Sequence, residues 1–149
     1  MKKVIIAGIQ TKATSDLDKN LARAVILVKQ AARRGAQIIC LPELFRTPYF
    51  PQKRKQNKFE FVEVVPSFNT RAIQKLAKTL GVVIIMPIYE MTLANKFFNT
   101  AVVFDNHGKL LGKYHKIHIP QDPGFYEKDY FEAGKTGYKI FKTKFATFA

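Results

Sequence analysis

The feature that most constrains this chain is a short apolar run that stops at a proline and is followed by a carboxylate. The run is Ile38-Ile39-Cys40-Leu41, and Pro42 and Glu43 come directly after it. Consecutive apolar residues predict a strand covered on both faces, as in a mainly parallel sheet, and proline ends such a strand. Ligands of open α/β sheets lie beyond the carboxyl ends of the strands. Glu43 is therefore either a working acid or base or an ordinary cap or salt-bridge residue.

The residues before this run predict a strand and a helix. Val4–Gln10 is the expected strand, and Ser15, three residues before Asp18, suggests a capping-box-like helix start. Gly35 suits a left-handed helix stop. Strand, helix and strand together predict a βαβ unit with parallel strands and a right-handed crossover. The apolar face of the helix consists of Leu17, Leu21, Ala24, Val25, Val28 and Ala32.

The remaining pattern predicts a second helix and a mixed sheet. Helical spacing of apolar residues extends over Ala72–Leu80 and should end at Gly81. Two of the later strands flank a three-residue hairpin loop, which adds an antiparallel portion. The expected class is therefore α/β. A length of 149 residues is typical of a single domain. The expected later strands are Val82–Tyr89, Phe98–Asp105, Lys109–His115, Tyr138–Phe141 and Lys144–Phe148.

Charge and cysteine content restrict the partners and the compartment. The formal net charge of +14 suggests nucleic acid or acidic lipid as a possible class of partner. The basic residues are scattered, however, except for Lys53-Arg54-Lys55 and nearby Lys58. No nucleic-acid-binding motif accompanies them, so a solvated basic face is favoured. A single cysteine fits a reducing compartment, and Val4–Ile9 is too short to span a membrane. We expect a soluble, cytoplasmic protein without a membrane partner.

Two segments hold further candidate side chains. His115 and His118 suggest a metal site, but no third ligand follows at suitable spacing, so local packing or hydrogen bonding is favoured. Lys116, taken alone, is typical of a surface lysine. Tyr49 and Phe50 lie between two prolines, where aromatic side chains can either line a pocket or pack beneath a loop. Both interpretations stay open.

Three segments taken together resemble the carbon–nitrogen hydrolase (nitrilase) superfamily. They are Leu41–Phe45, Tyr114–Pro120 and Pro123–Lys128, and residues 44–50 look most like the branch that hydrolyses N-carbamoylputrescine. The resemblance implies the amino-terminal portion of a four-layer α-β-β-α sandwich that often dimerises through its helices. It also implies hydrolysis of a small linear amide or carbamoyl compound, with no metal and no cofactor.

The resemblance assigns roles to individual residues. Glu43 would be the general base, Lys116 the oxyanion stabiliser and Glu127 an auxiliary glutamate, while Tyr49 and Phe50 would contact substrate. The chemistry agrees with these roles, because an attacking cysteine must lose its proton to a base. The negatively charged oxygen of the tetrahedral intermediate is then stabilised by a fixed cation beside it.

The nucleophile is the departure from the family pattern. In the family, the cysteine ends an apolar strand after the segment matching Lys139–Thr147, and this chain stops a few residues before that point. Cys40 is the only cysteine, and alternation along its strand should turn it away from the site. We therefore expect residues 1–149 to be an incomplete domain that is inactive alone. The rival interpretation is a basic binding module that uses Lys53–Lys58 on nucleic acid or a partner subunit.

Overall fold

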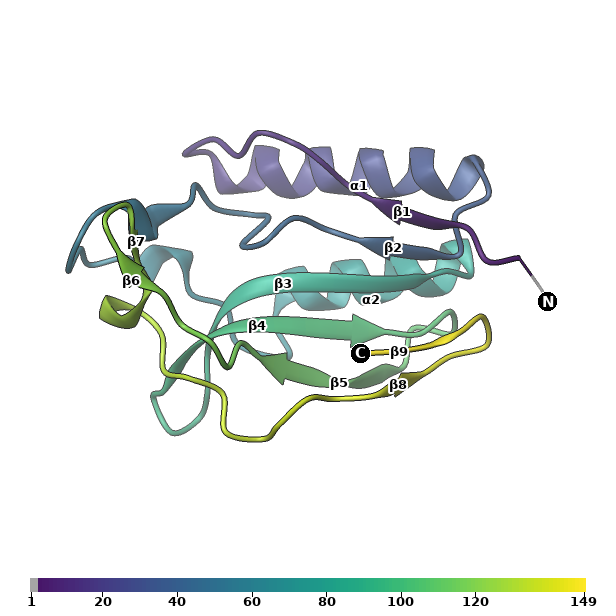
Figure 1. The fold of residues 1–149 in the computed structure, drawn as a ribbon. Helices are drawn as coiled ribbons and strands as arrows, with labels where there is room; N and C mark the ends of the chain where they lie inside the picture. Colours follow the sequence, from purple (N-terminus) through teal and green to yellow (C-terminus); the bar gives the residue numbers. More distant parts are fainter. Residues whose placement is uncertain (1–2) are drawn as a thin grey trace.

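A five-stranded mixed sheet organises the chain, with the strands in the order β1-β2-β3-β4-β5 (Figure 1). The computed structural model describes residues 3–149. β1, β2 and β3 run parallel, and β4 and β5 continue the sheet antiparallel. The predicted α/β class with a mixed sheet is thus confirmed. The strands of this sheet are β1 (Ile6–Gly8), β2 (Ile38–Cys40), β3 (Val83–Met91), β4 (Phe97–Phe104) and β5 (Leu110–His115).

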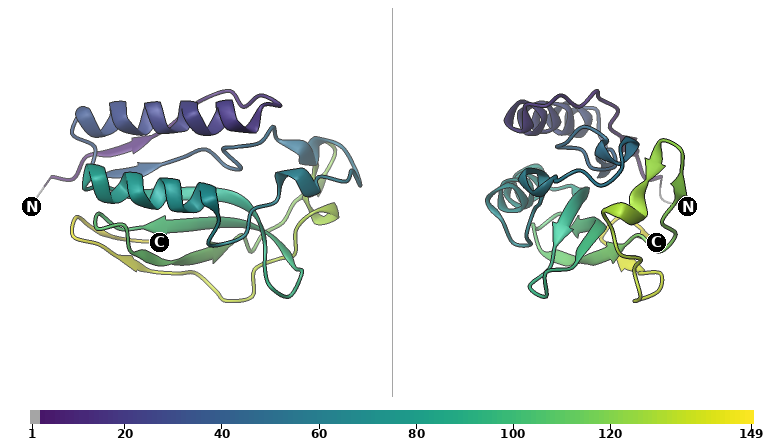
Figure 2. Two further views of the ribbon diagram at one scale, coloured as in Figure 1. Left: turned by 180° about the vertical axis from the view of Figure 1, so that it is seen from behind. Right: turned by 90° about the vertical axis from the view of Figure 1, so that its left-hand side faces the viewer.

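Both long helices cover the same face of the sheet (Figure 2). They are α1 (Leu17–Arg33) and α2 (Phe68–Leu80). β1, α1 and β2 form the predicted βαβ unit, because a parallel pair needs a crossover connection and the helix supplies it. This arrangement brings the carboxyl ends of β1, β2 and β3 to one edge of the sheet, and Glu43 follows β2 at that edge.

The helix ends depend on specific caps. Asp16 caps α1 by accepting a hydrogen bond from the backbone N–H of Lys19 at 3.0 Å, so the predicted cap at Ser15 is wrong by one residue. A carboxylate one position later reaches that N–H from an extended backbone. α2 begins at Phe68, earlier than predicted, because Ser67 and Thr70 form a capping box. Gly81 ends α2 with φ +66°, as predicted.

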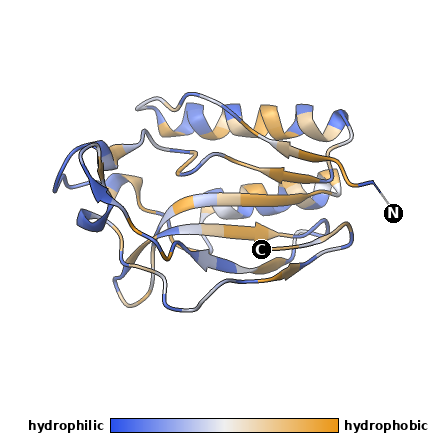
Figure 3. Cartoon of the chain, in the orientation of Figure 1, coloured by the Kyte–Doolittle hydropathy of each residue, from blue (hydrophilic) through white to orange (hydrophobic). Residues whose placement is uncertain are grey.

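The central strands are largely apolar in sequence (Figure 3) and are buried on both faces, as that sequence predicts. Ile39 and Leu41 belong to the core between the sheet and the helices. Ile38 belongs to a second core on the opposite face, where Phe141 packs against Val103. Alternate residues of β2 therefore face two different apolar layers, which explains the absence of polar alternation in this strand.

The carboxy-terminal part differs from the prediction. The strands there are only β8 (Phe141–Lys142) and β9 (Thr147–Phe148), which pair with each other in a separate hairpin. The hydroxyl of Thr143 donates to the carbonyl of Ala146 and accepts from the N–H groups of Phe145 and Ala146. These bonds turn the chain between the two strands, which are both shorter than the predicted Tyr138–Phe141 and Lys144–Phe148. β1 is likewise shorter than the predicted Val4–Gln10.

The loop after β5 contains short regular elements that the sequence did not reveal. A hairpin of β6 (Gln121–Asp122) and β7 (Phe125–Tyr126) leads into the 3₁₀ turn η3 (Glu127–Asp129). Two further 3₁₀ turns, η1 (Phe50–Gln52) and η2 (Phe59–Phe61), lie between β2 and α2. Within residues 3–149, neither long helix combines the length and the hydropathy that crossing a bilayer requires.

Candidate functional site

Glu43 lies in the turn that follows β2. The N–H of Leu41 still donates to the carbonyl of Ile85, and Pro42 then ends the pairing, as the sequence predicts. Leu44 adopts φ +49°, which turns the chain sharply away from the sheet. The Glu43 side chain is 45% exposed, and its Oε1 accepts hydrogen bonds from Asn99 Nδ2 at 2.6 Å and Lys116 Nζ at 3.1 Å. A half-exposed carboxylate with two donors on one oxygen is suited to accept a proton on the other.

Lys116 lies between two carboxylates. It comes directly after β5, and its backbone N–H donates to the carbonyl of Asn99 at 2.9 Å. Its ammonium contacts three oxygens: Glu43 Oε1 at 3.1 Å, Glu127 Oε1 at 3.0 Å and Glu127 Oε2 at 2.9 Å. The two oxygens of Glu127 share one side of the ammonium and Glu43 lies at another, so the two carboxylates together fix its position. Lys116 is therefore a fixed cation and not a free surface lysine.

Glu127 is the buried member of the site, with 1% of its surface exposed. It opens η3, and its carboxylate accepts from Lys116 through both oxygens and from the hydroxyl of Tyr49 at 2.6 Å. A buried charge is tolerated only where it is paired and hydrogen-bonded, and these contacts supply both conditions. Glu127 consequently fixes the ammonium of Lys116 in place.

The electrostatics keep Lys116 charged. Burial alone would lower the pKa of Lys116, but the hydrogen bonds and charges of Glu127 and Glu43 outweigh it and raise that pKa above its ordinary value. Burial, together with the hydrogen bond and charge of Glu127, raises the pKa of the Tyr49 phenol well above its ordinary range. At neutral pH the site therefore holds an ammonium and a neutral phenol.

Tyr49 and Phe50, the two loop aromatics, have different surroundings. Tyr49 is partly buried and holds Glu127, as described above. Phe50 lies in an aromatic cluster, with ring centroids 5.0 Å from Tyr130 and 5.1 Å from Tyr89. Of the two alternatives left open, packing beneath the loop therefore describes Phe50, and Tyr49 packs against the same cluster.

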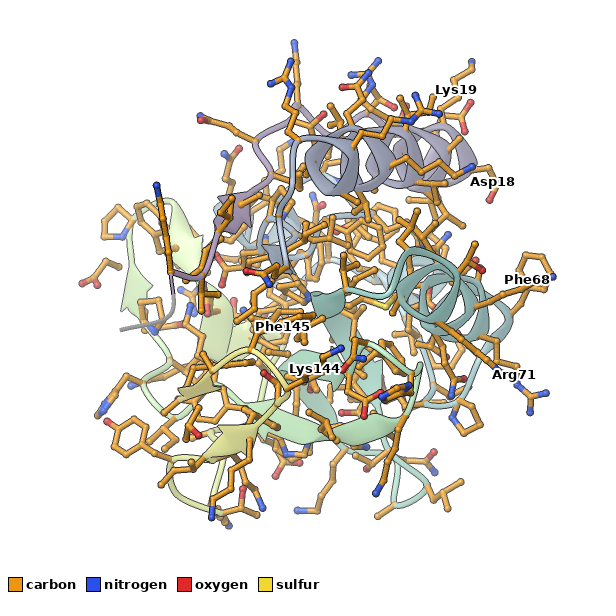
Figure 4. All side chains as sticks on the ribbon, turned by 90° about the vertical axis from the view of Figure 1, so that its right-hand side faces the viewer. Asp18, Lys19, Phe68, Arg71, Lys144 and Phe145 are labelled. Atoms are coloured by element: carbon orange, nitrogen blue, oxygen red, sulfur yellow. The ribbon has the colours of Figure 1, made fainter. Side chains whose placement is uncertain are left out.

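The packing of Phe50 makes a stability prediction. Phe50→Ala removes a buried ring and should destabilise the chain by about 3–5 kcal/mol, measured by urea unfolding. Phe68→Ala is the matched control, because Phe68 is 84% exposed and projects from α2 away from the core (Figure 4). The control should change stability by less than about 0.5 kcal/mol. Equal effects of the two substitutions would contradict the packing described for Phe50.

Cys40 lies outside the charged cluster. It pairs in register with Ile85, and it shares the strand face of Ile38, opposite to Ile39 and Leu41. This orientation is the one predicted from strand alternation. Its Sγ contacts the carbonyl of Leu41 at 3.4 Å, and burial raises the pKa of the thiol. A raised pKa keeps the thiol protonated, which is the opposite of what an attacking thiolate needs.

Asn99 is the site residue that sequence reasoning missed. It is buried in β4, where its side chain contacts Glu43 and its carbonyl contacts the backbone of Lys116. The available signal was a polar amide, followed by Thr100, inside a strand whose other residues are apolar. Buried amides need partners, so this position pointed to a polar neighbour that the sequence could not name.

The two histidines have local partners, as predicted. The ring of His115 stacks on Phe98 with centroids 4.1 Å apart, and its Nε2 lies 3.0 Å from a carboxylate oxygen of Glu90. His118 Nε2 lies 3.4 Å from the hydroxyl of Tyr138. Across residues 3–149, no group of three or more acidic, histidine or cysteine side chains is arranged to bind a metal ion.

The basic segment is partly engaged within the chain itself. Arg54 Nε lies 3.3 Å from Asp129, and its guanidinium lies over the ring of Tyr126. Lys58 lies 3.8 Å from Glu60. The segment is therefore partly packed and partly solvated. This favours a solvated basic face over a nucleic-acid interface.

Comparison with known proteins identifies the family. The family model described as carbon–nitrogen hydrolase matches residues 5–149. The chain is 42% identical to the N-carbamoylputrescine amidase of Solanum lycopersicum over 144 residues, which are 96% of this chain and 48% of that enzyme. It is 40% identical to the N-carbamoylputrescine amidase of Arabidopsis thaliana over 146 residues, 97% of this chain and 48% of the relative.

A solved structure agrees with these matches. The carbon–nitrogen hydrolase from Helicobacter pylori G27 superimposes with a TM-score of 0.85 and 32% identity, over 94% of this chain and 48% of that one. The chain thus spans about half the length of the curated relatives it matches. The family match, the relatives and the fold agree, and the chain belongs to the carbon–nitrogen hydrolase (nitrilase) superfamily.

Proposed function

We propose that this chain carries the base and the oxyanion-stabilising cation of a hydrolase that cleaves a carbon–nitrogen bond. The substrate class is a small linear amide or carbamoyl compound. The observation that supports this proposal most is the ammonium of Lys116, held between the half-exposed Glu43 and the buried Glu127. A purely structural ion pair would need only one carboxylate, whereas this arrangement keeps a second one open to solvent.

The proposed reaction has two halves that use the same side chains. A cysteine thiol gives its proton to Glu43 while its sulfur bonds to the substrate carbonyl carbon, and the carbonyl oxygen becomes an oxyanion beside Lys116. Protonated Glu43 then gives the proton to the leaving nitrogen, and ammonia departs. Glu43 next takes a proton from water, which attacks the acyl group and releases the thiol. Glu127 keeps Lys116 charged and in place throughout.

The nucleophile in this proposal is not Cys40. The Cys40 thiol lies on the strand face opposite to Leu41, and burial raises its pKa. We therefore propose that the attacking cysteine is supplied from outside residues 1–149 and that the chain by itself is inactive. Residues 1–149 would then form one incomplete domain of this enzyme class.

N-carbamoylputrescine is the substrate we propose. The support is the similarity to two plant enzymes that carry this name, at 42% and 40% identity. Hydrolysis would give putrescine, carbon dioxide and ammonia. We propose that Tyr49 contacts the substrate from the loop before η1, while Phe50 supports the loop from the aromatic cluster.

Two further proposals concern the setting of the enzyme. A single cysteine fits a reducing compartment, and we propose a cytoplasmic location on that basis. We also propose that the active enzyme is a homo-oligomer, as the family resemblance implies.

Ammonia release tests the proposed function directly. The chain alone should release no ammonia from N-carbamoylputrescine in a coupled glutamate dehydrogenase assay, and Cys40→Ala should leave this result unchanged. In a fused enzyme, Ala149 is followed by the segment of the Solanum lycopersicum relative that comes after the matched region. This fused enzyme should release ammonia. Turnover by the chain alone that disappears in Cys40→Ala would place the nucleophile at Cys40. A folded but inactive fused enzyme would contradict the proposed function.

A further inference from the structure

Asn99 contacts both partners of the ion pair in the proposed site. Its side-chain Nδ2 donates to Glu43 Oε1 at 2.6 Å, and its carbonyl accepts from the backbone N–H of Lys116 at 2.9 Å. Asn99 lies in β4, opposite Tyr89 of β3, and is 6% exposed. One buried residue in the rigid sheet thus determines where the base stands relative to the cation.

Glu43 needs such a restraint. Its side chain is 45% exposed and has three rotatable bonds, and it belongs to a turn and not to the sheet. A lysine–glutamate pair with this exposure gains little from charge alone and can adopt many geometries. A neutral amide held in a strand restricts the carboxylate to one position, because its donor points from a fixed backbone.

The distribution of the two hydrogen bonds on Glu43 is also informative. Asn99 and Lys116 both donate to Oε1. Among contacts with residues 3–149, Oε2 is therefore the oxygen left for proton transfer. An oxygen that already accepts two hydrogen bonds is a weaker proton acceptor than its free neighbour.

We propose that Asn99 is a positioning residue that fixes Oε1 of Glu43 against Lys116 and thereby selects Oε2 as the oxygen that accepts the proton. This inference rests on the proposed function. Asn99 acts through Glu43 and touches no reacting atom in this assignment.

The test uses the chain itself and measures the environment of Lys116. The pKa of Lys116 is raised partly by its hydrogen bond to Glu43, so it reports whether the carboxylate is held there. It can be followed by NMR through the ε-carbon of labelled lysine. Glu43→Gln should lower the pKa of Lys116, and Asn99→Leu should lower it in the same direction because the released carboxylate leaves the ammonium.

Asn69→Leu is the matched control. Asn69 also donates through Nδ2 to a glutamate, Glu63, at 2.6 Å, but it lies at the start of α2. It should leave the pKa of Lys116 unchanged, although it also removes an amide–carboxylate hydrogen bond of 2.6 Å. Asn99→Ser, whose shorter side chain does not reach Glu43, replaces Asn99→Leu if the leucine variant does not fold.

The outcomes separate this inference from the function on which it rests. A fall in the pKa of Lys116 in both the Glu43 and the Asn99 variants supports the positioning role. A fall in Glu43→Gln with no change in the folded Asn99 variant overturns it and leaves the proposed function intact. No change in either variant means that Glu43 does not pair with Lys116 in solution, which overturns the inference and the proposed site together.

Discussion

Lys116→Met is expected to destabilise the chain by about 3 kcal/mol, and adding Glu127→Gln to the same molecule should recover most of that loss. The methionine fills the space of the lysine stem but leaves the carboxylate of Glu127 buried without its cation. Breaking a buried pair usually costs about 3–5 kcal/mol, and the 31% exposure of the Lys116 side chain places this case at the lower end. Glutamine removes the unpaired charge, so the double variant has no buried ion to neutralise.

Urea unfolding of the parent chain, both single variants and the double variant measures this coupling as a double-mutant cycle. Lys96→Met is the matched control. Its ammonium lies 3.0 Å from Glu132, nearly the same separation as in the Lys116–Glu127 pair, but both side chains are about half exposed. Exposed pairs contribute about 0–1 kcal/mol, so the control should change little. Additive effects of Lys116→Met and Glu127→Gln would show that the two side chains are not coupled in the folded chain.

The second large effect is expected on turnover. In the fused enzyme, Glu43→Gln should lower kcat by about a hundredfold or more, because the amide has nearly the same shape but accepts no proton from the thiol. Lys116→Ala should lower kcat to a similar degree through loss of charge stabilisation at the oxyanion. Steady-state ammonia release at saturating N-carbamoylputrescine gives kcat for each variant.

Glu60→Gln is the control for the carboxylate substitution. Glu60 pairs with Lys58 at 3.8 Å in the segment before α2 and makes no ion pair with Glu43, Lys116 or Glu127. The kcat of the Glu60→Gln enzyme should therefore stay close to that of the parent enzyme. A Glu43→Gln enzyme with near-normal kcat would exclude Glu43 as the base. A near-normal Lys116→Ala enzyme would equally exclude Lys116 as the oxyanion stabiliser.

Much of the fold could be predicted because its determinants are local. The apolar run before Pro42 predicted β2, and the helical spacing after Ser15 predicted α1. Gly81 predicted the end of α2. The features that were missed depend on single side chains. The Asp16 cap and the Thr143 turn each result from one side chain reaching a backbone group a few residues away, and several polar residues nearby offered the same chemistry.

The candidate site, in contrast to the fold, depends mostly on contacts between residues that are distant in the sequence. The resemblance pointed to Glu43, Lys116 and Glu127, and the structure brings these three together although 84 positions separate the first from the last. It did not indicate Asn99, nor that the hydroxyl of Tyr49 holds Glu127. Contacts of this kind depend on the register of β4 and on the path of the loop before η1, and no local pattern encodes either of them.

Two carboxylates around one ammonium imply a change of local charge during the proposed reaction. In the resting cluster, the carboxylates of Glu43 and Glu127 together outweigh the single positive charge of Lys116. When Glu43 takes up a proton it loses its negative charge, and its hydrogen bond from Lys116 weakens. The cation is then shared with one negative carboxylate fewer, in the same step in which the oxyanion forms. Proton uptake by Glu43 would thus make Lys116 a stronger partner for the oxyanion when the nucleophile attacks.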